Sequence, residues 1–527
     1  MAWVDRGRNW LTERIIASIE GASGGGASGI GAVAAALVTG KRGMIPESAN
    51  EDLRAAGIYH IVSISGLHMV LAAGLFLWAM RAAFALFPGL ALARPIKMWA
   101  ALFAMAGASA YCLFSGSEVA TQRSLIMTLV MLGAVVCGRA AISMRNLAIA
   151  ALLVLSLDPN ALLGPSFQMS FVAVAAMIAA FERRAGAPAA NDIWGMSLPR
   201  QDPAKDLRAD PFGRAMLLAI AMGVTTLVAS IATDPYALYH FHRITPYGLL
   251  GNMLVLPLIE IVVMPAAVLG VIAAPFGLDG PVWSLMGQGI AFMMSVAQWV
   301  ANLSGSVLLL PAFGPAALLL MTSAILWVTL WQTRVRWAGI GFAVAGVIMA
   351  WPTPQPDFLV SGQGRLAAYR NNRGVLEILN ARANMFGAAQ WLASDADRRK
   401  PDAQDIAGKG RCDRSGCIGR MRDGRILALL LSRAALTEDC GRADIVVTAL
   451  QAAAYCKGPE LVIDRDWLKV RGAARGFLQT DGTMRFETSL SPLADRPWSP
   501  LPAGTVRAAA KHQPAKPKDD GGWVKAR

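Results

Sequence analysis

The stretch Gly57-Ile-Tyr-His-Ile-Val-Ser-Ile-Ser-Gly-Leu-His-Met69 stands where a mixed-polarity N-terminal region gives way to a long hydrophobic sequence. Polar groups at the start of a hydrophobic segment are costly in a bilayer unless they face water or other protein groups. The stretch is therefore the first candidate for a functional site. Its candidate residues are His60, Ser63, Ser65, Gly66 and His68.

The composition around this stretch is that of a membrane protein. The chain has 527 residues, of which 55% are hydrophobic and only 16% are charged, and its mean hydropathy is +0.45. Soluble domains are about one-quarter charged. The sequence therefore predicts a polytopic α-helical membrane protein with roughly ten spans and a small β-rich extracytoplasmic domain at the C-terminus.

The apolar windows that predict these spans follow one another from residue 61 to residue 352. Pro257 and Pro265 fall inside one window, with Glu260 between them. A helix broken in this way is tolerated where protein or water satisfies the freed backbone groups, and in a transporter it marks a coupling-ion site. The windows lie near 61–80, 96–114, 119–137, 146–163, 165–181, 213–233, 247–274, 282–304, 306–332 and 336–352.

Basic residues in the joints between windows give an orientation. The joints with Arg81, Arg139 and Arg334 fall on one side of a ten-span protein, and the short joints near 115–118 and 158–160 fall on the other. Cytoplasmic loops carry the excess of Lys and Arg. We therefore expect the N-terminal region and the C-terminal domain to lie outside the cytoplasm.

Composition also divides the chain into regions. Residues 1–57 are expected to form interfacial, amphipathic helices, because the apolar run 32–38 is too short to span, and the membrane domain follows over 58–352. Alternating runs separated by glycine turns predict a β-rich soluble domain over 353–501. The Ala-, Lys- and Pro-rich residues 502–527 predict a disordered basic tail.

Cysteines and net charge bear on the compartment and the partners. The spacings of Cys412, Cys417, Cys440 and Cys456 lack the CxxC knuckle of a zinc site. Two disulfides in an oxidising compartment are favoured over free thiols, with the pairing left open. The net charge of +14 fits an anionic partner, either nucleic acid or lipid headgroups, or basic loops plus a basic tail alone.

Several ordered motifs resemble one known family. Ser63-Ile-Ser-Gly-Leu-His-Met69 looks like the signature of ComEC-type competence proteins, and the resemblance extends over roughly residues 30–350. These proteins form the inner-membrane channel through which one strand of DNA enters the cytoplasm in natural transformation. The other matching stretches are Thr121–Met127, Asp158-Pro159, Ser166–Phe171, and His240-Phe241 with Asn252, Pro257 and Pro265.

The resemblance implies a location and a set of partners. It places the chain in the bacterial inner (plasma) membrane as a multi-pass protein, with the C-terminal domain in the periplasm. The implied partners are single-stranded DNA, membrane lipids and other competence proteins, namely a DNA receptor and cytoplasmic DNA-handling proteins. A homo-oligomer is left open.

Two departures from the family pattern limit what the resemblance implies. Family members usually carry an OB-fold module between an earlier pair of spans, and this chain begins after the place where that module would end. Many end in a metallo-β-lactamase-like domain whose His-x-His-x-Asp-His cluster binds two metals. Here His512 is the only histidine after His242. We therefore expect a reduced version of that fold with no metal, no cofactor and no enzymatic activity.

The candidate residues of the membrane domain each have a functional and a structural interpretation. His60 and His68 can line a polar pathway or hydrogen-bond neighbouring helices. Arg123 can compensate phosphate charge or pair with Glu118 or Glu260. An interhelical hydrogen bond is the favoured role for Gln168.

Three functions follow from these interpretations. The first is a passive, non-enzymatic channel for single-stranded DNA. The second is a secondary transporter of a small anionic solute, coupled through Glu260 or His68. The third is a degenerate assembly component that transports nothing. No phosphate-binding GxxxxGK[ST] loop occurs in the sequence, so ATP hydrolysis by a P-loop is excluded.

Overall fold

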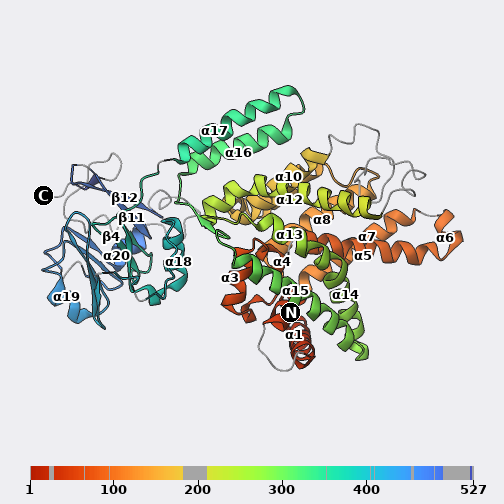
Figure 1. Ribbon diagram of the computed structural model, residues 1–527, viewed down its shortest axis with the longest axis horizontal. Coiled ribbons are helices and arrows are strands. Elements are labelled where there is room, and N and C mark those ends of the chain that lie inside the picture. The colour runs from red at the N-terminus through yellow and green to blue at the C-terminus, as the bar shows by residue number, and fades with distance from the viewer. Residues whose placement is uncertain are drawn as a thin grey trace. The chain divides into compact units, whose positions relative to one another are not determined.

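The computed structural model divides the chain into two compact units (Figure 1). One consists of Met1–Leu308 with Pro315–Ile348, and the other of Leu309–Gly314 with Met349–Arg527. We call them the helical unit and the C-terminal unit. The structure describes residues 2–22, 29–64, 66–93, 95–181, 211–351, 353–403, 405–408, 410–452, 456–479, 481–490 and 523–524.

The helical unit is built from helices, and the residues 182–210 between α10 and α12 lie outside the described part of the chain. A two-residue strand, β1 (Arg243–Ile244), lies between α12 and α13, and another, β2 (Leu308–Leu309), follows α15. The helices are α1 (Ala2–Ala22), α2 (Ile30–Thr39), α3 (Glu47–Ala55), α4 (Tyr59–Val62), α5 (Gly66–Ala85), α6 (Pro88–Ala93), α7 (Ile96–Phe114), α8 (Val119–Val136), α9 (Met144–Leu157), α10 (Pro165–Phe181), α12 (Pro211–Phe241), α13 (Gly248–Leu258), α14 (Met264–Ala273), α15 (Gly280–Ala301), α16 (Pro315–Leu330) and α17 (Gly339–Ala350).

Among the described residues, four helices are long and apolar enough to cross a membrane. The predicted windows 96–114 and 165–181 coincide with α7 and α10. The predicted count of roughly ten spans is not confirmed, because several windows contain shorter helices. The four helices are His68–Ala85, Ile96–Phe114, Val119–Val136 and Gly248–Phe276, and the shorter apolar ones are Ile30–Thr39, Met144–Leu157, Pro165–Phe181 and Pro315–Leu330.

Proline explains two of these boundaries. Pro315 is the first residue of α16, where its missing N–H costs nothing, so the helix begins there and not near residue 306. Pro257 and Pro265 flank a π-helical turn, Ile259–Val263, that joins α13 to α14. Each proline removes a backbone donor, and the wider turn carries the chain through the break.

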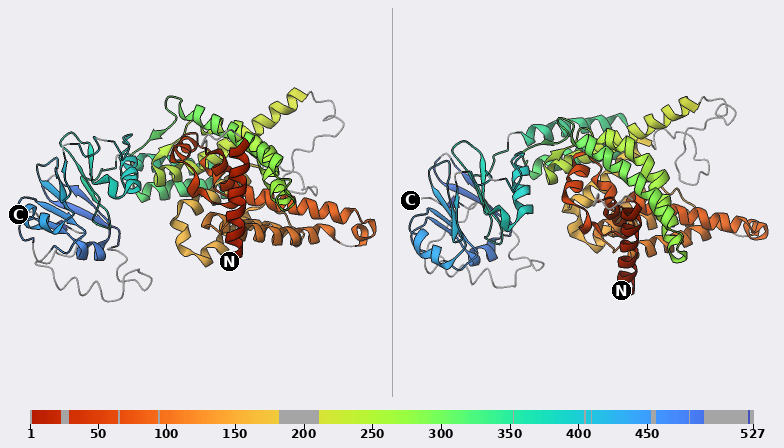
Figure 2. Two further views of the ribbon diagram at one scale, coloured as in Figure 1. Left: turned by 90° about the horizontal axis from the view of Figure 1, so that it is seen from below. Right: turned by 60° about the horizontal axis from the view of Figure 1, so that its bottom comes forward.

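Within the region 1–57, for which interfacial helices are expected, α2 lies in the core of the helical unit. The side chains from Val33 to Leu37 are at most 1% exposed and belong to the core cluster that also contains Ile15 of α1 and Trp283 of α15. Small alanine side chains let the neighbouring helices approach closely, so a short helix can be buried without spanning. Figure 2 shows α1, the dark red helix, beside other helices of the unit.

An ion pair joins α1 to the start of α15. Arg14 Nε and Nη2 donate to the two Asp279 oxygens at 2.6 and 2.7 Å, and Trp283 Nε1 donates to one of them at 2.6 Å. Asp279 lies in the connection before α15 and is 2% exposed. The Arg14 hydrogen bonds lower the pKa of Asp279 to about 2. The carboxylate is therefore stabilised in its charged form.

The C-terminal unit contains two sheets. One is antiparallel, with strand order β13-β12-β11-β3-β4-β5, and the other is mixed, with order β10-β9-β8-β7-β6. The strands are β3 (Phe358–Val360), β4 (Ala367–Arg370), β5 (Leu376–Leu379), β6 (Arg411–Cys412), β7 (Gly416–Arg420), β8 (Ile426–Leu430), β9 (Ile445–Thr448), β10 (Leu461–Ile463), β11 (Ala474–Leu478), β12 (Met484–Thr488) and β13 (Trp523–Val524).

The two sheets pack face to face, with helices on their outer faces. Side chains alternate along a strand, so Leu427 and Leu429 of β8 point to the core shared with Phe358 and Tyr369. Ala428 and Leu430 point the other way, to α19 (Arg433–Asp439). In the same way α18 (Met385–Ser394) covers the first sheet. A third helix, α20 (Arg465–Arg471), follows β10. The predicted β-rich C-terminal region is therefore present.

Two disulfides lie in this unit. Cys412 is bonded to Cys417 across the β6–β7 hairpin, and Cys440, which follows α19, is bonded to Cys456. Most of the predicted tail 502–527 lies outside the described residues, and its residues Trp523 and Val524 pair with β12.

Replacing Arg14 by Gln should destabilise the helical unit. The Asp279 carboxylate would stay buried without its cation, which costs about 3 to 5 kcal/mol in a fully buried pair and less here because the Arg14 side chain is 36% exposed. Thermal unfolding in detergent measures the loss. The matched control is Arg54→Gln, which breaks the exposed Arg54–Glu47 pair and should cost less than about 1 kcal/mol. Equal losses in the two variants would contradict the burial of Asp279.

The same ion pair predicts a pH dependence. An unfolded aspartate titrates near pH 3.9, while the folded-state pKa of Asp279 is about 2. The stabilisation is therefore complete above about pH 4 and is lost as the pH falls from about 4 toward 2. Unfolding midpoints of wild type and Asp279→Asn, compared at pH 6, 4 and 3, should converge with decreasing pH. A constant difference would exclude this titration.

Candidate functional site

The candidate residues of the helical unit lie at corresponding ends of their helices. His68 is the third residue of α5, Arg123 the fifth of α8, Gln168 the fourth of α10 and Asn252 the fifth of α13, while His240 is the last but one of α12. Short connections join α7 to α8 and α9 to α10. The chain turns back at each of them, so α8 and α10 both begin at the end of the unit at which α5 begins. Contacts between the helices show whether the residues also meet.

The first contact joins the segment before α4 to α13. Gly57 has a positive φ of 72°, and a methyl group there would lie 2.8 Å from Gly248 Cα. A methyl group at Gly251 would lie 2.7 Å from the Ala56 carbonyl oxygen. Only glycine permits such an approach of two backbones. The beginning of the motif is therefore held against the beginning of α13.

The second contact joins α5 to α8. A methyl group at Gly66 would lie 3.8 Å from Ser124 Oγ, which is ordinary contact, and His68 is 1% exposed. Thr121, Ser124 and Thr128 share this face of α8 because their spacing is that of one helix face. The Oγ1 atoms of Thr121 and Thr128 are buried and have no hydrogen-bond partner among the described residues.

The third contact joins α8 to α10 through Arg123. Its Nη2 donates to Ser166 Oγ, and the side chain is 6% exposed. The sequence left Glu118 and Glu260 open as partners of Arg123. Instead Glu118 pairs with Arg42, and Glu260 is exposed in the π-helical turn with no ion pair to any described residue. Arg123 thus meets a hydroxyl and no carboxylate.

The fourth contact joins α10 to α12. Gln168 Oε1 lies 2.8 Å from His240 Nε2, and Gln168 Nε2 donates to the Leu162 carbonyl at 2.9 Å. This is the interhelical hydrogen bond that the sequence favoured for Gln168. Because the six residues 242–247, which include β1, connect α12 to α13, the four contacts form a closed circuit of helix ends. We call it the motif ring: Gly57, Gly66, Arg123, Ser166, Gln168, His240 and Gly248.

The other candidate residues lie near the ring or outside the described residues. Ser63 Oγ donates to the His60 carbonyl at 2.9 Å, and the His60 side chain is exposed. Asn252 is buried, and its Oδ1 has no hydrogen-bond partner in the described part of the chain. Ser65 is outside the described residues. Glu260 lies about two turns beyond Asn252, away from the ring.

Sequence reasoning missed Arg8, which fixes the end of α7 next to the ring. Its Nη2 donates to the Thr39 carbonyl at 2.8 Å and to the Ser115 carbonyl at 3.3 Å. A cation at two helix C-termini neutralises their partial negative charge. Gly40 and Gly116, both with positive φ, bring the chain close to this site. Such turn glycines after apolar runs were the available signal.

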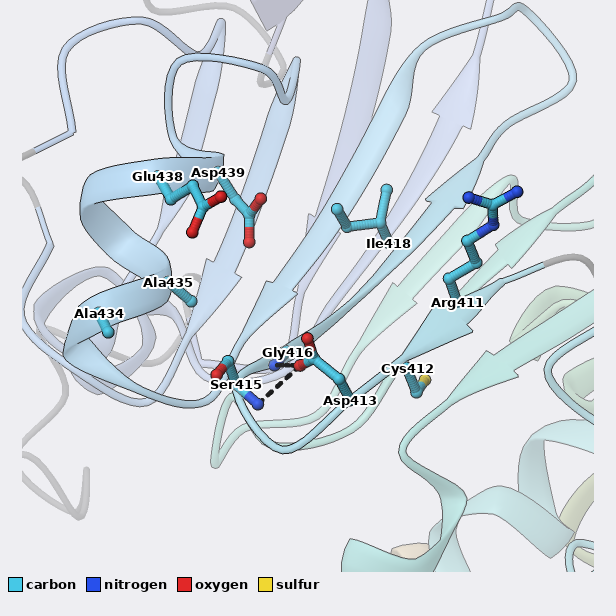
Figure 3. A pocket seen from close by; sticks show the side chains of 10 residues that line it. All are labelled: Arg411, Cys412, Asp413, Ser415, Gly416, Ile418, Ala434, Ala435, Glu438 and Asp439. Carbon is cyan, nitrogen blue, oxygen red and sulfur yellow. Dashed lines mark hydrogen bonds between the residues drawn. The ribbon is translucent and has the colours of Figure 1, made fainter.

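The C-terminal unit has a small hollow of about 270 Å³ between the β6–β7 hairpin and α19 (Figure 3). Asp413 Oδ1 accepts hydrogen bonds from the backbone N–H groups of Ser415 and Gly416 at 2.7 and 2.8 Å, which lower the pKa of Asp413. Glu438 and Asp439 lie on the opposite wall. Within the described residues, no group of three or more His, Cys, Asp or Glu side chains could hold a metal ion.

Comparisons with known proteins agree on one family. The competence protein family model matches residues 37–335, which is more than half of the chain. The match includes all residues of the motif ring. No solved structure matches the chain.

Three curated relatives were compared in sequence. Competence protein ComA of Neisseria gonorrhoeae is 39% identical over 30% of this chain and 22% of its own length. The uncharacterized protein YcaI of Escherichia coli K12 is 24% identical over 66% and 44%. ComE operon protein 3 of Bacillus subtilis is 22% identical over 46% and 27%. The match thus covers less than half of each relative.

Replacing Gly57 by Ala should weaken the motif ring. The change strains a left-handed backbone by about 1 kcal/mol and forces apart the contact with Gly248, which costs roughly 1 to 3 kcal/mol more. Gly138→Ala is the matched control, because Gly138 has a φ of 67° and nothing within 4 Å of its added methyl group. Thermal unfolding should show the larger loss for Gly57→Ala; equal losses would deny the close approach.

Proposed function

The chain belongs to the competence protein family, and from this premise we propose that its helical unit forms an inner-membrane passage for single-stranded DNA during natural transformation. The motif ring carries the proposal. It brings together, from five separate helical segments, the stretches in which the sequence resembles the family. Polar groups gathered inside a membrane protein serve a cavity or a pathway more often than packing alone.

Buried polar atoms around the ring support a hydrated interior. Thr121 Oγ1, Thr128 Oγ1 and Asn252 Oδ1 are buried and lack a hydrogen-bond partner among the described residues. Buried groups of this kind are normally satisfied, and water is the usual partner when protein supplies none. Water along α8 and α13 would give a strand of DNA a polar route through the unit.

The distribution of basic residues among the connections supports an orientation of the helical unit in the membrane. In the proposed topology of about ten spans, the connections before α8 and α10 lie on the periplasmic side, because the basic connections lie on the other side. The motif ring then stands at the periplasmic mouth of the passage. The C-terminal unit is periplasmic in the same topology, an oxidising compartment in which its two disulfides persist.

We propose no catalytic step for this chain. To conduct DNA, the protein must compensate the charge of the phosphate groups and provide a polar route through the membrane. The driving force comes from partner proteins that deliver and capture the strand. The name of one relative, competence protein ComA, refers to competence. Membrane lipids surround the helical unit, and a homo-oligomer is compatible with this proposal.

The break at Glu260 favours a second candidate function. A carboxylate in a π-helical turn between two prolines resembles the coupling-ion sites of secondary transporters. Under that alternative the chain moves a small anionic solute, and DNA uptake does not depend on it. Glu260 lies outside the motif ring, so we rank this function second.

Transformation frequency in the native host tests the proposal. Deleting the gene should abolish DNA uptake. The double variant Thr121→Val, Thr128→Val should reduce uptake at least tenfold while its thermal stability is little changed, because valine has nearly the shape of threonine and neither hydroxyl has a hydrogen-bond partner among the described residues.

Thr225→Val is the matched control, since the Thr225 hydroxyl donates to the Ala221 carbonyl of its own helix at 2.7 Å. It should leave uptake intact at equal membrane levels. Normal uptake in the double variant would show that this face of α8 does not line the pathway. Normal uptake after gene deletion would reject the DNA passage and leave the small-solute transporter.

A further inference from the structure

Arg123 is a buried cation with no opposite charge beside it among the described residues. Of the described residues of the helical unit, only Arg123 and Asp279 are buried and charged, and Asp279 has its partner in Arg14. Arg123 forms no ion pair with any described residue, and its Nε has no hydrogen-bond partner there. An uncompensated charge in a buried position costs several kcal/mol, so binding of an anion at this position would be favourable.

The surroundings of the guanidinium make that cost larger. Its hydrogen-bond acceptor, Ser166, is the second residue of α10, a helix of 17 residues with no acidic side chain in its first turn. The amino end of a helix carries a partial positive charge. The guanidinium and this helix end therefore repel each other unless an anion lies against both, and helix amino ends commonly bind phosphate groups.

The Ser166 hydroxyl connects the buried charge to the surface. Its oxygen accepts the hydrogen bond from Arg123, and its proton is donated to no group in the described part of the chain. The side chain is exposed. An oxygen acceptor at Ser166 would gain a hydrogen bond strengthened by the charge behind it. This hydrogen bond joins α8 to α10, and both helices are labelled in Figure 1.

We propose that Arg123, Ser166 and the amino end of α10 form a binding site for one phosphodiester group of the transported strand. This inference rests on the proposed function, which supplies a polyanion at this place. A guanidinium suits the geometry of phosphate oxygens. One charge per site binds weakly, so each phosphate can leave for the next, as conduction requires.

Salt dependence of DNA binding tests the site. The full-length protein in phosphatidylcholine nanodiscs is titrated with a fluorescent oligothymidylate at several salt concentrations. Each phosphate contact on single-stranded DNA contributes about 0.7 to the slope of log K against log salt. Arg123→Gln should reduce the slope by about 0.7, and Ser166→Ala should weaken binding. Arg145→Gln is the matched control, because Arg145 is exposed at the start of α9, and it should leave the slope unchanged.

An oligonucleotide with an uncharged backbone tests whether the site binds the phosphate charge. Wild type and Arg123→Gln should bind a methylphosphonate oligonucleotide equally, since it carries no phosphate charge. Thermal stability should be unchanged or higher in Arg123→Gln, because the variant removes an uncompensated charge. A loss of stability would instead make Arg123 a structural residue and overturn the inference.

Other outcomes separate this inference from the proposed function. Equal slopes for wild type and Arg123→Gln would overturn the site, as would absence of salt-dependent binding by the wild type. If Arg123→Gln alters binding of phosphatidylglycerol in mixed nanodiscs and not of DNA, the site takes a lipid phosphate and the inference fails. Loss of transformation on gene deletion would still support the DNA passage in each case.

Discussion

A polar group removed from water must find a partner, and this requirement shapes the helical unit. Asp279 receives three hydrogen bonds from Arg14 and Trp283, and the carbonyls of Thr39 and Ser115 share Arg8. At these positions the hydrogen bonds within the protein satisfy the polar groups, and no ligand is needed to explain them. Within the described residues of the helical unit the requirement is not met at Thr121, Thr128, Asn252 and Arg123 Nε, nor at His242 Nδ1 and Arg336 Nε. The first four lie on α8 and α13, two of the helices that carry the motif ring.

Features that depend on neighbours in the chain could be predicted from the sequence. Apolar runs bounded by Pro, Gly and charged residues predicted α7 and α10 to the residue, and two prolines predicted the break beside Glu260. The alternating runs predicted strands in the C-terminal unit. Their arrangement into an antiparallel and a mixed sheet, each covered by a helix, depends on pairing between distant segments, and short runs carry no signal for it.

Features that depend on packing were harder to predict. The apolar run 32–38 is too short to cross a bilayer, and on that ground the sequence predicted an interfacial helix. Length is a valid criterion only for a segment that faces lipid. The structure surrounds α2 with protein, a setting in which length is no limit. Likewise the sequence identified Arg123 as a buried cation but not its partner, because Ser166 is 43 residues away and a hydroxyl is no obvious partner for a charge.

The burial of α2 has a consequence for the biosynthesis of the protein. One of the helices that pack against α2, α15, begins at Gly280. The ribosome must therefore add roughly 240 residues after α2 before α15 can pack against it. At about 5 to 20 residues per second, this delay is on the order of tens of seconds. During that time the alanine-rich helix has its contacts with α1 and α4 but not its contact with α15. A chain truncated before α15 would therefore leave uncovered the face of α2 that packs against α15.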